Sequence, residues 1–374
     1  MANSKRAEKL LVKLVRTNSE NPPGDMRKIA DIIRKEMKSI GMDVHAYTFK
    51  KNMPNVVGIL KGSVKGKTLL LTPHMDTVPA GKGWKHAPFG AEIKNGKIYG
   101  RGSEDCKINV AACLEAARSI YESGVKLNGN LVIAVTPDEE TGSKFGLKQL
   151  IDRKIINPDY AVVADGNSFD VVVAQKGLVH MKVEIFGKKA HGARPWLGVN
   201  AIEEASEIIC ELKKYKFRYK KHPLMGKPTM NIGTITGGEK VNIVADYCCF
   251  EIDLRYLPGM NANKILGDFR KIISKKARKF RILISDHQKP YETEGNSPAA
   301  QQLLKSLKKF KSSAALRGSE GATAIAFFKN RNAVATGFGP KDVAHMTDEY
   351  SRISDLVSGA KALEDFIREY LGYR

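Results

Sequence analysis

Residues 67–79, KTLLLTPHMDTVP, hold the clearest indication of the architecture. Three consecutive leucines form a short apolar run that a proline closes, which is typical of a strand buried on both faces of a sheet. His74 and Asp76 follow this run directly. Because ligands of open α/β sheets bind beyond the carboxyl ends of the strands, this strand end is a candidate for a functional site.

Apolar runs of the same kind alternate with helical segments in the first half of the chain and again near its end. In residues 29–40 the apolar side chains recur at helical spacing, and Gly41 ends that helix. Further strands are expected at residues 55–60 (NVVGIL), 131–137 (LVIAVTP), 160–165 (YAVVAD) and 332–340 (NAVATGFGP), with helices near residues 109–121, 298–310 and 356–366. The alternation predicts an α/β domain with a mostly parallel sheet covered by helices.

A different pattern begins around Lys176. In residues 180–186, HMKVEIF, apolar and polar side chains alternate, as in an antiparallel strand with one exposed face. A helix from about Asn200, two strands (229–236, 247–256), a helix near 261–275 and a strand (281–285) follow. This β-α-β-β-α-β order predicts a ferredoxin-like α+β domain, residues 177–286, inserted into an α/β domain made of residues 1–176 and 287–374.

The composition allows two domains and carries a large positive charge. The 374 residues are 42% hydrophobic and have a formal net charge of +22. Basic clusters at residues 213–221 and 275–281 leave a nucleic-acid-binding protein as a remote alternative. No zinc knuckle, RNA-binding motif or helix-turn-helix pattern accompanies them. Attraction of a carboxylate-bearing substrate is the favoured consequence, and a merely lysine-rich surface is the plainer one.

The cysteines and the N-terminal residues bear on the compartment. Five cysteines, of which Cys248 and Cys249 are adjacent, contain no CxxC pair and make a poor disulfide framework. No stretch approaches the roughly 18 consecutive apolar residues of a membrane span, and residues 1–20 lack an uninterrupted apolar segment. A cytoplasmic protein with no membrane partner is therefore expected.

Acidic and histidine side chains gather where the predicted strands end. They are His74, Asp76, Asp105, Asp138, Glu139, Glu140, Asp165 and His345. Imidazole and carboxylate groups that converge from separate strand ends suit zinc-like divalent metals. Singly, each has a plainer interpretation: Asp105 fits a helix N-cap, the adjacent glutamates fit a solvated turn, and a lone histidine is more often only a satisfied polar residue. Their joint occurrence favours a metal site.

Several segments resemble the successive signatures of the M20 family of metallopeptidases and deacylases. They are residues 73–79 (PHMDTVP), 88–107 (PFGAEIKNGKIYGRGSEDCK), 137–143 (PDEETGS) and 339–350 (GPKDVAHMTDEY). Residues 176–202 and 237–259 are similar to the inserted domain of the same family. The resemblance spans nearly the whole chain in the family's order.

The resemblance implies a site for two divalent metal ions, with zinc as the default and cobalt as an option. Asp105 would bridge the two ions. His74 and Asp165 would complete the first site, and Glu140 and His345 would complete the second.

Two further acidic residues are implied to assist the reaction without binding metal. Asp76 would hold the His74 imidazole in the required tautomer. Glu139, which stands beside a ligand in the chain, would be the general base and later the general acid.

Three residues of the inserted domain are implied to contact the substrate. The inserted domain, residues 177–286, would be a dimerisation domain of the catalytic domain formed by residues 1–176 and 287–374. His191 would be an oxyanion donor that reaches the active site of the partner subunit in a homodimer. Asn242 and Arg255 would bind the substrate, and the guanidinium of Arg255 suits a carboxylate. The plainer alternatives are an exposed loop histidine at His191 and an ion pair of Arg255 with the acids of its own strand, Glu251 and Asp253.

The chain departs from the family pattern at two places. Residues 106–109, CKIN, replace a run that usually contains two glycines. In residues 317–328, RGSEGATAIAFF, Ala324 stands where the family often has an aspartate, which leaves the acyl or amino-acid specificity open. Arg317 and Glu320 are candidates to substitute for the missing polar group.

These features predict a two-metal hydrolase that cleaves the amide bond of N-acyl amino acids. Within the family we favour the acetylornithine deacetylase and succinyl-diaminopimelate desuccinylase group, and hence a role in amino-acid biosynthesis. The alternative is a metallo-carboxypeptidase or dipeptidase. A non-catalytic binding protein would have lost ligands or Glu139, and none is missing.

Overall fold

The computed structural model describes residues 2–166, 168–328 and 332–373 and divides the chain into two compact units. The first unit comprises Met1–Val173, Thr293–Arg317 and Thr323–Arg374. The second comprises Ala174–Glu292 and also Gly318–Ala322. The insertion predicted from the sequence, residues 177–286, lies within this second unit, whereas the return of Gly318–Ala322 to it was not anticipated.

A nine-stranded sheet has most of its residues in the first unit, whereas its residues 174–175, 291–292 and 318–319 are assigned to the second. Its order is β1-β2-β6-β3-β7-β15-β8-β13, with β14 beside β8. The central strands β6, β3, β7 and β15 pair in parallel, and antiparallel β1 and β2 lie at one edge. The bounds are β1 (Asp43–Thr48), β2 (Pro54–Leu60), β3 (Val64–Thr72), β6 (Asn128–Val135), β7 (Tyr160–Ala164), β8 (Val171–Gln175), β13 (Tyr291–Glu292), β14 (Leu316–Ser319) and β15 (Ala333–Thr336).

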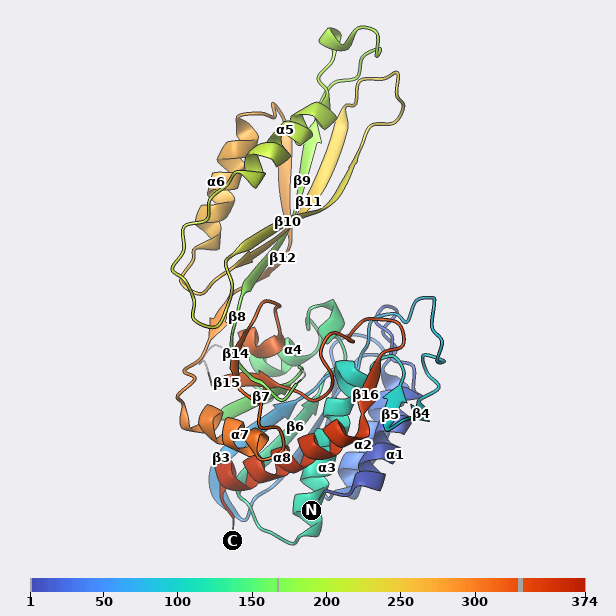
Figure 1. Cartoon of the computed structure of the whole chain (residues 1–374), viewed down its shortest axis with the longest axis vertical. Coiled ribbons are helices and arrows are strands. Elements are labelled where there is room, and N and C mark those ends of the chain that lie inside the picture. Colours follow the sequence, from blue (N-terminus) through green and yellow to red (C-terminus); the bar gives the residue numbers. More distant parts are fainter. Residues whose placement is uncertain (1, 167, 329–331, 374) are drawn as a thin grey trace. The chain divides into compact units, whose positions relative to one another are not determined.

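Helices cover this sheet, as Figure 1 shows for α3 and α8, which lie side by side. The helices are α1 (Ser4–Val15), α2 (Arg27–Ser39), α3 (Ile108–Glu122), α4 (Leu147–Asp152), α7 (Pro298–Lys308) and α8 (Ile353–Leu371). Leu69 and Leu71 of β3 are fully buried in one core with residues of α3 and α8. The predicted α/β architecture with a mostly parallel central sheet is confirmed.

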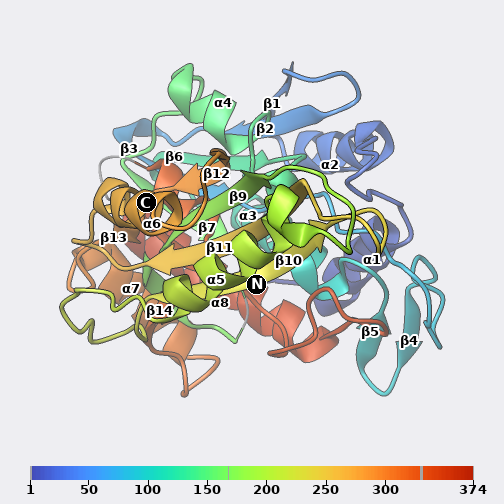
Figure 2. The same ribbon diagram turned by 90° about the horizontal axis from the view of Figure 1, so that it is seen from above.

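The second unit has the predicted β-α-β-β-α-β order. Its elements are β9 (Gly177–Phe186), α5 (Ala201–Lys213), β10 (Thr229–Gly237), β11 (Tyr247–Tyr256), α6 (Ala262–Ser274) and β12 (Phe280–Gln288). The strands pair antiparallel in the order β10-β11-β9-β12. Helices α5 and α6 lie next to each other against this sheet, as seen from above in Figure 2. Alternate residues of β9, such as Val179 and Met181, are buried under them.

Several short elements were not predicted. Strands β4 (Glu92–Lys94), β5 (Lys97–Tyr99) and β16 (Tyr350–Arg352) form a separate three-stranded sheet in the order β16-β5-β4. This small sheet brings the segment before Asp105 beside the segment after His345. None of the helices in the described ranges has the length and apolar character that crossing a membrane requires.

Candidate active site

The polar residues predicted from the strand ends come from five segments of the first unit. His74 lies just beyond β3, Glu139 and Glu140 lie in a turn beyond β6, and Asp165 lies just beyond β7. Asp105 lies in the turn before α3, and its φ of −112° and ψ of 96° are not helical. His345 lies in the loop between β15 and β16, with a φ of 63°. Parallel strands that end at one edge of the sheet explain why these segments meet.

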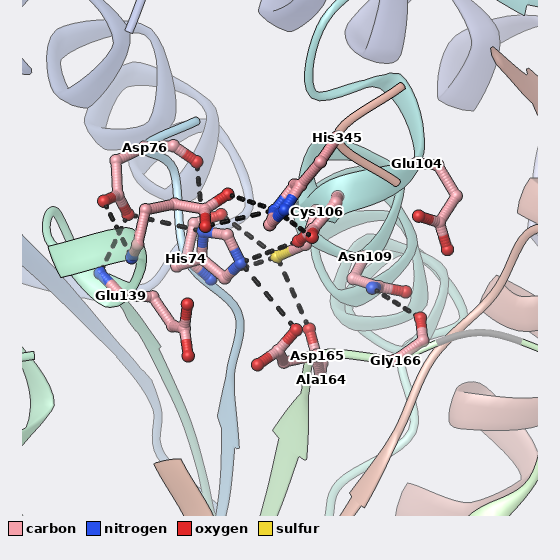
Figure 3. A network of polar contacts seen from close by, with 12 residues as sticks. His74, Asp76, Glu104, Cys106, Asn109, Glu139, Ala164, Asp165, Gly166 and His345 are labelled. Atoms are coloured by element: carbon pink, nitrogen blue, oxygen red, sulfur yellow. Dashed lines mark hydrogen bonds and ion pairs between the residues drawn. The ribbon is translucent and has the colours of Figure 1, made fainter. Parts of the chain in front are cut away.

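Asp105 lies between the two histidines, and each of its oxygens faces a different ring. Figure 3 shows the side chains of His74 and His345 at this site, with Asp165 close to His74. His74 Nε2 is 3.1 Å from Asp105 Oδ1. His345 Nε2 is 3.2 Å from Asp105 Oδ2. A carboxylate held in this way has the geometry of a bridging ligand.

The other carboxylates extend this arrangement on either side. His74, Glu139 and Asp165 offer ligand atoms within 4.8 Å of one another, and so do Asp105, Glu140 and His345. His345 Nε2 is 3.2 Å from Glu140 Oε2, and His74 Nε2 is 3.8 Å from Asp165 Oδ1. Asp105 belongs to the second group and also lies against His74 of the first. Two adjoining groups of imidazole and carboxylate donors therefore fit a pair of divalent ions.

The proximity of opposite charges perturbs both imidazoles. The carboxylates of Asp105 and Glu140 raise the pKa of His345 to about 10. Burial by itself would lower the pKa of His74, yet the carboxylates around it, Asp105 first, raise it well above its usual value. Burial would raise the pKa of Asp105, but the two imidazoles, His345 first, hold it well below the normal range.

The pKa values of the two adjacent glutamates are raised, whereas that of Asp105 is lowered. Burial, followed by the charge of Asp165, raises the pKa of Glu139 well above its ordinary value. Burial also raises the pKa of Glu140, and Asp105 adds to the shift while His345 opposes it. Burying several carboxylates close together disfavours their charged forms. Such an arrangement is typical of sites that hold cations or move protons.

Asp76 supports the site through more contacts than the sequence indicated. His74 Nδ1 lies 3.0 Å from the backbone oxygen of Asp76 and 3.3 Å from its Oδ1, which leaves Nε2 directed at Asp105. The Asp76 carboxylate also accepts the backbone N–H groups of Glu139 (3.0 Å) and Glu140 (3.2 Å). Asn21 Nδ2 donates to Asp76 Oδ2 at 3.0 Å. Asp76 thus holds the turn that carries both glutamates as well as the histidine.

Two neighbours of the site residues make hydrogen bonds to the backbone around the cluster. Burial raises the pKa of the Cys106 thiol to about 12, so the thiol stays protonated, and it donates to the backbone oxygen of His74 at 3.3 Å. Asp138, the first acid of the DEE run, instead accepts the N–H of Phe145 at 2.7 Å and shapes the turn.

Arg101, Glu349 and Asn21 are site neighbours that the sequence interpretation passed over. Glu349 accepts the backbone N–H groups of Glu104 (2.8 Å) and Asp105 (3.1 Å). Arg101 stands four residues before Asp105, and Glu349 stands four residues after His345. The signal available in the sequence was a charged residue four positions away from each of these two predicted ligands.

The three substrate-binding candidates all lie in the second unit. The segments of His191 and Asn242 are adjacent, since Gly192 N donates to the backbone oxygen of Asn242 at 2.8 Å. His191 is exposed, and its Nδ1 accepts the N–H of Ala193. The guanidinium of Arg255 pairs with both carboxylate oxygens of Asp253, at 2.7 and 3.1 Å. The plainer interpretation of Arg255, an ion pair on its own strand, is thus what the structure contains.

Both candidates to replace the family's missing aspartate contact other residues. Arg317 Nε donates to Asp170 Oδ2 at 3.3 Å. Glu320 accepts the N–H of Gly226 and pairs with the buried Lys176. Each side chain therefore has a local ion pair that accounts for its position.

Comparison with known proteins agrees with this geometry. The model of Peptidase family M20/M25/M40 matches residues 70–369. An uncharacterized metallohydrolase of Methanocaldococcus jannaschii is 30% identical, over 97% of this chain and 98% of that protein. An acetylornithine deacetylase of Vibrio atlanticus is 30% identical, over 72% of this chain and 73% of its own. An M20 family metallo-carboxypeptidase from Sulfolobus solfataricus has a similar fold, with a TM-score of 0.82, 22% identity and coverage of 97% and 99% of the two chains.

Proposed function

The chain belongs to peptidase family M20/M25/M40 and is a metallohydrolase of amide or peptide bonds, and from that premise we propose that it removes the acyl group of N-acyl amino acids with the help of two divalent ions. The observation that carries the proposal is the position of Asp105, whose two oxygens face His74 and His345. In this proposal His74, Asp105 and Asp165 hold one ion, and Asp105, Glu140 and His345 hold the other. Zinc is the default, because the donors are imidazoles and carboxylates, and cobalt is the alternative.

The residues around the ligands divide the work of hydrolysis. Divalent ions in such a site supply Lewis acidity, which activates water at neutral pH and polarises the amide carbonyl. The Glu139 carboxylate takes a proton from the attacking water and gives it to the nitrogen of the departing amine. Burial raises the pKa of Glu139, and a higher pKa makes its carboxylate a better proton acceptor.

The second unit contributes substrate contacts in this proposal. His191 donates a hydrogen bond to the oxyanion that develops on the acyl carbon, and it does so in the active site of a partner subunit. Asn242 and Arg255 bind the remainder of the substrate, for which Arg255 has to exchange its pairing with Asp253 for a substrate carboxylate.

A homodimer through the second unit is part of the same proposal. β10 is an edge strand with mostly exposed residues, and an unpaired edge is a template for pairing with a second copy. Trp196, with 74% of its surface exposed, and Val241 add apolar surface to the same unit.

The choice of substrate separates the proposal from its main alternative. Similarity to an acetylornithine deacetylase favours N-acyl amino acids and a role in amino-acid biosynthesis. A carboxypeptidase or dipeptidase activity is the second candidate, and the fold shared with a metallo-carboxypeptidase supports it. Five free cysteines favour a reducing compartment, in keeping with a cytoplasmic enzyme.

A hydrolysis panel tests the proposal. Protein stripped by a chelator and reloaded with zinc or cobalt is given N-acetylornithine, N-acetyl-lysine, N-succinyl-diaminopimelate, N-acetylmethionine and simple dipeptides. We expect metal-dependent release of amine from at least one acyl amino acid. Cleavage of dipeptides alone would move the assignment to the peptidase alternative, and no metal-dependent cleavage of any of them would contradict the proposal.

A further inference from the structure

A buried ion pair lies behind the two segments that carry Asp105 and His345. Arg101 NH1 donates to Glu349 Oε2 at 2.6 Å, and the side chains are 2% and 0% exposed. Removing two charges from water is costly, so a pair buried this deeply has to be matched by further hydrogen bonds. The proposed reaction uses neither residue.

Those further hydrogen bonds lead to the backbone of the metal-ligand segments. Glu349 Oε1 accepts the N–H of Glu104 at 2.8 Å and the N–H of Asp105 at 3.1 Å. Arg101 NH2 donates to the backbone oxygens of His345 at 3.3 Å and Ala80 at 3.4 Å. One ion pair thus holds the main chain at both Asp105 and His345.

The surrounding contacts keep the pair in place. Strands β5 and β16 pair alongside it, and Gly100 N donates to the backbone oxygen of Glu349 at 2.9 Å. The Arg101 guanidinium also lies over the Trp84 ring, 5.1 Å from the ring centre. The side chains therefore have little freedom to turn away from the segments that they hold.

We propose that Arg101 and Glu349 are positioning residues that set the metal affinity of the second ion site, formed by Asp105, Glu140 and His345. This inference rests on the proposed two-ion function. The ion pair contacts the backbone of two of the three ligands of the second site, Asp105 and His345. Of the ligands of the first site, it contacts only Asp105. Loss of the pair therefore weakens the second site more than the first.

The test compares three variants by stepwise titration of metal-stripped protein with cobalt, followed by absorption, and with zinc, followed by elemental analysis after dialysis. Glu349→Gln keeps an oxygen that can accept the two backbone N–H groups but removes the charge that orients Arg101. Arg101→Lys keeps the charge but cannot reach Glu349 and two carbonyls at once. Glu115→Gln is the matched control. Glu115 is also buried, accepts the Asn3 N–H at 2.6 Å and pairs with Arg6 at 2.7 Å, next to α1.

We expect wild-type protein and Glu115→Gln to bind two ions with the same affinities. In Glu349→Gln and Arg101→Lys, the affinity of one of the two sites should fall about tenfold to a hundredfold, as is typical when an outer partner of a ligand is lost, while that of the other is little changed. Equal weakening of both sites, unchanged affinity of both sites, or an equal loss in Glu115→Gln would overturn the inference. If Glu349→Gln does not fold, Arg101→Lys decides alone. Wild-type protein that does not take up two ions would instead refute the proposed function.

Discussion

Glu139 and Glu140 are adjacent in the chain but differ in their surroundings. Glu140 contacts His345 and, together with Asp105 and His345, offers one group of ligand atoms. Glu139 instead belongs to the group of His74 and Asp165. Both depend on Asp76, which accepts the backbone N–H of each. At the scale of single residues, we therefore expect a glutamine at the two positions to cause different defects, one in turnover and the other in metal content.

Glu139→Gln should reduce kcat by about a hundredfold to ten-thousandfold, because a proton acceptor is lost, while two ions remain bound. Glu140→Gln is the matched comparison and should lose metal, since an amide is a poorer ligand than a carboxylate. Elemental analysis together with turnover measures both effects. A Glu139→Gln protein with normal turnover would refute its assignment as the base.

Metal loading should release protons from the stripped protein. The carboxylates of Asp105 and Glu140 raise the pKa of His345 to about 10, so its ring carries an extra proton at neutral pH when no ion competes for it. An imidazole that coordinates metal must be deprotonated. The apparent affinity should therefore rise with pH through the neutral range and fall on acidification. Calorimetric titration in two buffers of different ionisation enthalpy measures the release, and a heat that does not depend on the buffer would contradict it.

At the scale of elements, what could be predicted depended on length and periodicity. β9, β11, α2 and α8 are long and strongly patterned, so their apolar spacing records which face is buried. The short strands β4, β5 and β16 carry no such pattern, because their existence depends on a partner far away in the chain. The same holds for the site: the motifs identified His74 and Asp105, but the contact of Glu349 with Asp105 spans 244 residues and could not be read from spacing.

The packing of α8 gives an element-scale prediction. An added Cβ at Gly359 would lie 2.4 Å from the buried Phe338 ring, so Gly359→Ala should destabilise the first unit by about 1–3 kcal/mol through overpacking, despite the better helix propensity of alanine. Gly267→Ala in α6 is the control. A Cβ there meets nothing within 4 Å, and the change should stabilise the second unit by about 0.5–1 kcal/mol. Thermal and denaturant unfolding measure both. An unchanged midpoint for Gly359→Ala would contradict the packing described for α8.

At the scale of the whole molecule, the candidate metal ligands and the proposed substrate contacts lie in different units of the chain. The metal-ligand candidates lie in the first unit, and His191, Asn242 and Arg255 lie in the second. The net charge of +22 is an attribute of the entire surface and fits the attraction of anionic substrates. Filter binding of DNA and RNA at two salt concentrations distinguishes this from nucleic-acid recognition, for which binding would persist at moderate salt.

Complementation between two inactive variants tests whether His191 acts across a dimer. His191→Ala should lose most turnover while its metal content and dimerisation stay normal. Mixed with Glu139→Gln and allowed to exchange subunits, it should regain activity, because one site of the heterodimer combines Glu139 with the partner's intact histidine. A mixture that stays inactive although heterodimers form would show that His191 does not act across the interface.

The most direct measurement is anomalous diffraction from crystals of the metal-loaded protein. We predict two peaks about 3.5–4 Å apart, which is the spacing of two-metal sites. One Asp105 oxygen should be bound to each ion, with His74 and His345 on opposite sides. A single peak, or two peaks that do not share Asp105, would contradict it.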